Sequence, residues 1–278
     1  MIKKINTPSG VLSYEIEGEG IPVMLVHGFG EDGYVWNEIR TSLSSTYQII
    51  IPHLRGTYLS PINDLSLIDN LSMESMAADM LKIIDAEQLD KVIILGHSMG
   101  GYITLAFAEK YDERLLAFGL IHSTSYADSE AKKEARLKSV EFLKNNTTKS
   151  FLEVATPNLF GTQFKKNHPK KVNELIERAS QITEASMMAY LRAMRKRKDS
   201  TEILIKTTKS VFFCIGMQDN AVNPEDAIQQ SKLPEHAQTL ILEEAGHQGM
   251  MEAPERLIEA IRIFIDKYVL QPREPRQQ

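Results

Sequence analysis

The chain has 278 residues, 42% of them hydrophobic and 25% charged, which is enough for one sizeable α/β domain with an insertion. Its formal net charge of −5 argues against a nucleic-acid-binding surface. The single cysteine, Cys214, excludes an internal disulfide, and no apolar stretch is long enough to span a membrane. Because the first residues lack the apolar core of a signal peptide, we expect a cytoplasmic protein that binds no nucleic acid and has no membrane span.

Short apolar segments separated by turn residues predict the strands of a sheet. Residues 1–6 and 11–17 alternate in polarity around a Thr-Pro-Ser-Gly turn, which is typical of a hairpin. Continuous apolar runs, typical of strands covered on both faces, follow at 22–26, 47–51, 92–95, 116–121, 211–215 and 238–242. Between them lie helical patterns, such as the methionine-rich stripe that starts after the N-cap candidate Ser72. The alternation predicts an α/β fold with a mostly parallel sheet and helices on both faces, and residues 271–278 indicate an irregular tail.

The segment Gly96-His97-Ser98-Met99-Gly100-Gly101 joins the strand at 92–95 to a helical stretch at 102–110. A G-x-S-x-G sequence between a strand and a helix is typical of a sharp turn that exposes a nucleophilic serine. Glycine at positions 96 and 100 leaves room for neighbouring backbone where a Cβ atom would clash. Ser98 is therefore the candidate nucleophile, and the backbone N–H of Met99 is placed to stabilise an oxyanion.

A second glycine-rich loop, His27-Gly28-Phe29-Gly30, follows the strand at 22–26. In a parallel sheet this loop lies at the same edge as the turn that contains Ser98. The backbone N–H of Phe29 can then join that of Met99 in an oxyanion hole.

The pattern changes between residues 123 and 202, where no strand-like run occurs. Helical patterns dominate this part of the chain, most clearly at 129–145, 169–181 and 184–198. We interpret it as a helical lid (123–204) inserted into an α/β core (1–122 and 205–278), with its apolar side chains packed on the core or lining a pocket. Met187, Met188 and Tyr190 are the candidates for the pocket, and the basic run at 192–198 is interpreted as a solvated helix end.

Two further polar residues follow predicted strands and complete a catalytic set with Ser98. Asp219 comes just after the strand at 211–215, and His247 lies on the loop after the last strand. A serine hydroxyl needs an imidazole to accept its proton, and the imidazole needs a carboxylate to fix its tautomer. Asp219 and His247 fit these roles, although Asp128, Glu243 and Glu244 are alternative carboxylates.

The order Ser98, Asp219, His247, together with the two glycine-rich loops, resembles the α/β-hydrolase superfamily over nearly the whole chain. The resemblance is to small lidded esterases and cofactor-independent peroxidase-type hydrolases, and it implies an eight-stranded sheet with a helical lid after the sixth strand. Related esterases often have a tryptophan where this chain has Trp36, which adds that residue to the candidate pocket. One departure is His53-Leu54-Arg55-Gly56, where members commonly have D-x-R-G.

Serine at position 98 argues against haloalkane dehalogenase and epoxide hydrolase activities, because those relatives carry aspartate as the nucleophile. We expect a serine hydrolase that cleaves carboxylic esters of small to medium, fairly apolar substrates without a cofactor or metal ion. The alternatives are hydrolysis of lactones, thioesters or carbon–carbon bonds, cofactor-independent perhydrolase activity, or a small-molecule receptor with slow turnover. The sequence makes no prediction of the oligomeric state.

Overall fold

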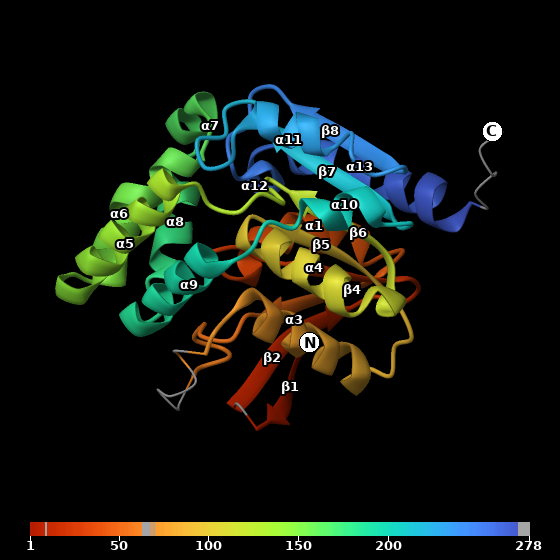
Figure 1. Cartoon of the computed structure of the whole chain (residues 1–278), viewed down its shortest axis with the longest axis horizontal. Coiled ribbons are helices and arrows are strands. Elements are labelled where there is room, and N and C mark those ends of the chain that lie inside the picture. Colours follow the sequence, from red (N-terminus) through yellow and green to blue (C-terminus); the bar gives the residue numbers. More distant parts are fainter. Residues whose placement is uncertain (9, 63–67, 69, 272–278) are drawn as a thin grey trace.

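The computed structural model describes residues 1–8, 10–62, 68 and 70–271 (Figure 1). In this part of the chain an eight-stranded sheet has the order β1-β2-β4-β3-β5-β6-β7-β8. The first two strands and β4 pair antiparallel, and all other pairs are parallel. The strands are β1 (Ile2–Thr7), β2 (Gly10–Glu17), β3 (Pro22–Val26), β4 (Gln48–His53), β5 (Val92–His97), β6 (Leu115–Ile121), β7 (Ser210–Gly216) and β8 (Ala237–Leu242). The predicted fold class is confirmed, and the tail expected at 271–278 lies outside the described residues beyond Gln271.

Helices cover the sheet, and this explains why the central strands are apolar along their whole length. Strands β5 and β7 are buried at every residue. Helices α3 and α4 pack on each other, with α4 against β5 and β6, while α13 packs against β7, β8 and α1. The elements of this core are η1 (Gly33–Trp36), α1 (Asn37–Leu43), α3 (Met73–Ala86), α4 (Met99–Lys110), η2 (Asp112–Arg114), α11 (Pro224–Gln230), α12 (Gly249–Glu252), α13 (Pro254–Phe264) and η4 (Ile265–Leu270). None of the helices in the described part of the chain has the length and apolar character that crossing a membrane requires.

The segment between β6 and β7, all of it within the described residues, contains helices and irregular loops but no strand. It contains α5 (Glu130–Asn145), α6 (Thr148–Ala155), η3 (Thr156–Leu159), α7 (Thr162–Asn167), α8 (Pro169–Ala179), α9 (Glu184–Lys196) and α10 (Thr201–Lys206). Figure 1 shows α5 to α9, in green and teal, gathered beside the sheet. The three helical patterns found in the sequence correspond to α5, α8 and α9, whereas α6, α7 and α10 have only six to eight residues and too few turns to show a period.

Hydrogen bonds tie the helical segment to loops at the carboxyl ends of the strands. The backbone N–H of His247, after β8, donates to the carbonyl of Leu159 at 2.6 Å. The Tyr190 hydroxyl, on α9, donates to the carbonyl of Arg55, after β4, at 2.7 Å. These contacts support the proposal that residues 123–204 form a lid over this edge of the sheet.

Candidate active site

Ser98 lies at a strained turn between β5 and α4. Its φ of 51° and ψ of −116° fall in a region that non-glycine residues rarely adopt, so packing must hold this conformation in place. A Cβ atom at Gly96 would overlap the carbonyl of Gly100, and one at Gly100 would overlap the carbonyl of Val26. Glycine at both positions therefore lets the chain turn sharply between a strand and a helix, which is the geometry that exposes a nucleophile.

Two backbone N–H groups proposed for the oxyanion hole lie close to this turn. Met99 is the first residue of α4, and the first N–H groups of a helix have no acceptor within the helix. Phe29 lies on the loop after β3, the parallel neighbour of β5. A Cβ atom at Gly28 would stand 3.1 Å from that of Ser98, so the two loops are in close contact. This proximity supports the proposed roles of Phe29 and Met99.

Asp219 and His247 form a buried hydrogen-bonded pair. The Asp219 Oδ2 atom lies 2.7 Å from His247 Nδ1. The other carboxylate oxygen, Oδ1, accepts the backbone N–H groups of Ala221 at 2.7 Å and Val222 at 2.9 Å. These bonds hold the carboxylate so that it fixes the imidazole with its proton on Nδ1, and they leave Nε2 free of that proton.

The pair shifts the pKa of each partner. Burial alone would raise the pKa of Asp219, but the imidazoles of His247 and His122 lower it well below its usual range. Burial alone would lower the pKa of His247, but the Asp219 carboxylate, with smaller contributions from Glu31 and Glu252, raises this pKa above its ordinary value. A neutral imidazole with a raised pKa is suited to accept the serine proton as the serine oxygen attacks a carbonyl.

Ser98 and His247 line one small cavity of about 120 Å³, which we call the Ser98 cavity. No hydrogen bond joins these two described side chains, as is common in sites without substrate. The other residues that line the cavity are Phe29, His97, Tyr102, Arg136, Leu159, Met194, Ala221, Val222 and Gln248. The candidate nucleophile and base thus face the same cavity.

A second cavity, of about 340 Å³, lies next to the first, and we call it the α5–α6 cavity. Phe29, Arg136, Leu159 and Ala221 line both spaces, so the two cavities are direct neighbours. Its further lining residues are Gly30, Lys132, Ala135, Ser139, Phe151, Leu152, Ala155, Thr156, Leu191 and Asn220. A larger cavity of about 460 Å³ lies between α7 and α13 and contains none of the three candidate catalytic residues.

The four side chains expected to line the pocket lie elsewhere. Trp36, Met187 and Tyr190 are wholly buried and Met188 is half-buried, and none of them lines either cavity beside Ser98. Tyr190 is held by the carbonyl of Arg55, which anchors its ring in the packing between α9 and the core. Helix α9 instead contributes Leu191 and Met194, which share its apolar face. Helical periodicity identified that face but not the turn that reaches the cavity.

Asp128, the alternative catalytic acid, pairs with arginines instead of with His247. Its buried carboxylate forms ion pairs with Arg136 and Arg197. Burial alone would raise the pKa of Asp128, but the two guanidinium groups lower it. Arg197 also lies over the ring of Tyr102, 3.9 Å from its centre. The expectation of a solvated helix end is therefore wrong for Arg197, whose charge is paired in the interior.

The sequence analysis missed Glu31, a buried carboxylate that connects three loops. It accepts the backbone N–H of Gly28 at 2.5 Å and pairs with His97, whose Nε2 donates to the carbonyl of His247 at 2.8 Å. Burial alone would raise the pKa of Glu31, but His97 lowers it below its usual value. No periodic pattern marks such a residue, because its role depends on partners distant in the sequence.

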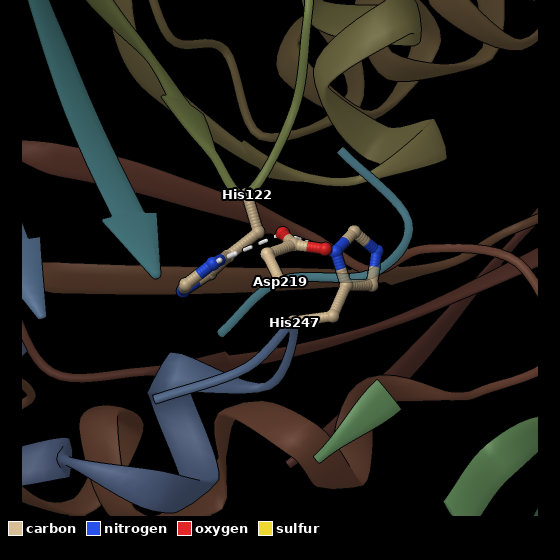
Figure 2. A group of neighbouring side chains, drawn as sticks. All are labelled: His122, Asp219 and His247. Atoms are coloured by element: carbon tan, nitrogen blue, oxygen red, sulfur yellow. Dashed lines mark hydrogen bonds and ion pairs between the residues drawn. The ribbon is translucent and has the colours of Figure 1, made fainter. Parts of the chain in front are cut away.

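His122, which directly follows β6, faces Asp219, the candidate catalytic acid. Figure 2 shows the Asp219 carboxylate between the rings of His122 and His247. His122 Nδ1 lies 3.6 Å from Asp219 Oδ2, and its Nε2 accepts the backbone N–H of Gly249 at 3.2 Å. The three side chains are close enough to ligate a metal ion together. However, the bond from Gly249 places the ring proton of neutral His122 on Nδ1, the atom that a metal would need.

Comparison with known proteins assigns the fold to a family. Residues 21–254 match the sequence model of the family described as alpha/beta hydrolase fold. A thermophilic esterase from Thermogutta terrifontis, solved with malate bound, is 30% identical, and the match covers 97% of this chain and 99% of that one with a TM-score of 0.88. The chain therefore belongs to the alpha/beta hydrolase fold family, as its resemblance implied.

A more distant solved structure shares the fold, and several curated proteins match in sequence. An esterase from Exiguobacterium antarcticum is 20% identical, with 96% of this chain and all of that one covered at a TM-score of 0.86. Epoxide hydrolase 1 of Caenorhabditis elegans is 23% identical over 268 residues, which cover 89% of this chain and 65% of that protein. In other curated relatives the matched region spans less than half of their length, 43% in one case and 28% in another.

Proposed function

We propose that this protein hydrolyses carboxylic esters through an acyl-enzyme formed on Ser98. The observation that carries the proposal is the placement of a strained serine in one cavity with His247, whose other ring nitrogen is bonded to Asp219. An activated serine beside an oriented imidazole is the arrangement that acyl transfer requires. The 30% identity with the T. terrifontis esterase, over nearly the whole of both chains, supports an ester as the substrate.

The first half of the reaction is acylation. His247 Nε2 takes the proton of the Ser98 hydroxyl while the serine oxygen attacks the ester carbonyl. The N–H groups of Phe29 and Met99 stabilise the tetrahedral oxyanion, and the ionised Asp219 stabilises the imidazolium that forms. His247 then gives its proton to the departing alcohol, which leaves the acyl group on Ser98.

Deacylation repeats these steps with water. His247 takes a proton from a water molecule, the hydroxide attacks the acyl carbonyl, and the same oxyanion hole holds the second tetrahedral intermediate. Collapse of this intermediate returns the proton to Ser98 and releases the acid.

The cavities favour small to medium, fairly apolar substrates. Phe29, Leu159 and Met194 contribute apolar surface beside Ser98, and Phe151, Leu152 and Leu191 extend it into the α5–α6 cavity. Two cations also reach this space, but Arg136 is paired with Asp128 and the Lys132 ammonium donates to the carbonyl of Ala221 at 3.0 Å. An acyl chain therefore has apolar contacts in both cavities.

The proposal is tested by mixing the protein with p-nitrophenyl butyrate. We expect release of p-nitrophenol and, in mass spectra of the quenched reaction, a butyryl group on the peptide that contains Ser98. A receptor with slow turnover would release almost none, and attack by a residue other than Ser98 would leave that peptide unmodified. Esters, thioesters and lactones of the same acyl size, compared by kcat/KM, then distinguish ester hydrolysis from the related reactions.

A further inference from the structure

The geometry around Asp219 points to His122 as a positioning residue for the catalytic acid: a neutral imidazole that directs its Nδ1–H toward Asp219 Oδ2 and holds the carboxylate in line with His247. This inference rests on the proposed function of the Asp219–His247 pair. It concerns a third side chain at that pair, which neither the sequence motifs nor the chemistry of acyl transfer requires.

The tautomer of His122 follows from its surroundings. The N–H of Gly249, the first residue of α12, donates to His122 Nε2 at 3.2 Å, so this nitrogen is an acceptor. In a neutral ring the proton then lies on Nδ1. Nδ1 is fully buried and has no hydrogen-bond partner among the described residues, but the Asp219 carboxylate stands 3.6 Å from it. The two atoms need to approach by only a few tenths of an ångström to form a hydrogen bond.

The backbone of His122 is held so that the ring reaches Asp219. The residue directly follows β6, and its N–H donates to the carbonyl of Cys214 at 2.8 Å. Its φ of 47° lies in the left-handed region, which few non-glycine residues adopt and which histidine and asparagine tolerate better than most. His122 is wholly buried beside the candidate active site. Backbone strain at such a position is typical of a polar side chain that must be held in one orientation.

Burial favours the neutral state of the His122 ring, and four groups face it. They are Asp219, His247 and His97, with the Cys214 sulfur 3.6 Å from Nε2. Burial lowers the pKa of His122 to about 4, despite the attraction of Asp219. A neutral donor stabilises the carboxylate but does not compete with His247 for the proton that the reaction moves.

The test compares His122→Leu with His122→Asn. Leucine fills the site without a donor, whereas the asparagine amide nitrogen can occupy the place of Nδ1 and asparagine tolerates a positive φ. For His122→Leu we expect kcat to fall on the order of 10-fold to 100-fold with KM nearly unchanged, as for a lost hydrogen bond to a charged group. The acid limb of its pH profile should move to higher pH. Without the His122 donor, Asp219 Oδ2 interacts with His247 alone and raises the pKa of that imidazole further. His122→Asn should recover most of kcat.

A matched control is His53→Leu, which removes another buried histidine at the end of a strand, away from Asp219. Similar losses of kcat in the folded His53→Leu and His122→Leu variants would overturn the inference, as would a His122→Asn variant no better than His122→Leu. A second readout does not depend on turnover, namely ¹⁵N NMR of the His122 ring between about pH 5 and pH 9. A proton on Nδ1 throughout is expected, and a proton on Nε2 would contradict the assignment whether or not the protein hydrolyses esters.

Discussion

The carboxylate of Glu31 and the imidazole of His97 are paired in the interior of the protein, where their side chains are 2% and 1% exposed. Glu31 also holds the backbone of Gly28, next to the proposed oxyanion donor Phe29. His97 precedes Ser98 and binds the carbonyl of His247. One buried pair thus fixes the relative positions of the nucleophile, the base and the oxyanion loop.

Glu31→Gln should weaken both stability and catalysis. The substitution removes the anionic partner of His97, and breaking a buried pair in this way costs on the order of 3 kcal/mol of unfolding free energy. Chemical denaturation at neutral pH measures the stability, and kcat for a p-nitrophenyl ester measures the alignment of the loops. Glu38→Gln is the control, because its ion pair with Lys171 is exposed and should contribute little. Equal stability of the two variants would show that the Glu31 pair does not join the loops.

Ser98→Ala should abolish ester hydrolysis and leave the fold intact, because it removes a single oxygen from the cavity. A loss on the order of 10⁴-fold in kcat is expected when a member of a catalytic triad is removed. His247→Ala should be about equally harmful, and the double variant should be no slower than either single variant, because the two residues act together. Near-normal turnover by Ser98→Ala with an unchanged melting curve would mean that another residue is the nucleophile.

Asp219→Asn and Asp128→Asn distinguish the two candidate acids. Asp219→Asn should lower kcat by roughly 10⁴-fold, because it removes the group that fixes the His247 tautomer. Asp128→Asn should instead lower the melting temperature, since it leaves Arg136 and Arg197 without their shared partner. If Asp128→Asn lost more kcat than Asp219→Asn, the catalytic acid would have to be moved to the loop after β6.

The pH dependence of kcat/KM should have an acid limb set by His247. The imidazole acts as a base only when neutral, so activity rises as pH increases through its pKa and is lost below it. Because Asp219 raises that pKa, the midpoint should lie above the ordinary histidine value of about 6.5. In Asp219→Asn the main cause of the increase is gone and burial remains, so the residual activity should have its midpoint at lower pH. An unchanged midpoint in this variant would argue against the pairing of Asp219 with His247.

Substrate preference should respond to Leu191 and Phe151, which line the α5–α6 cavity. Shortening either to alanine should alter kcat/KM across a series of p-nitrophenyl esters by about 1–3 kcal/mol of discrimination between short and long acyl chains. Met187→Ala is the matched control, because this side chain lies on the same helix as Leu191 and is wholly buried but lines neither cavity. It should lower the melting temperature and leave the order of ester preference unchanged. A uniform slowing of all esters by Leu191→Ala would mean that the acyl chain does not reach this cavity.

The sequence by itself determined the parts of the molecule that are encoded locally. A strand buried on both faces must be continuously apolar, so runs such as Val92–Leu95 were recognisable, and the α/β fold class followed from their alternation with helices. The turn at Ser98 was also predictable, because only glycine at positions 96 and 100 permits it. The candidate triad followed from chain order, since the carboxyl ends of parallel strands meet at one edge of the sheet.

Only the tertiary structure decided which distant side chains meet. The structure pairs Glu31 with His97, brings His122 close to Asp219 and pairs Asp128 with Arg197. In each case the two residues are far apart in the chain. The sequence also predicted an apolar face on α9 without showing which turn of the helix reaches the cavity. That choice depends on how the helix docks against its neighbours, because a period of 3.6 residues fixes the direction of a side chain but not the position of the helix along its axis.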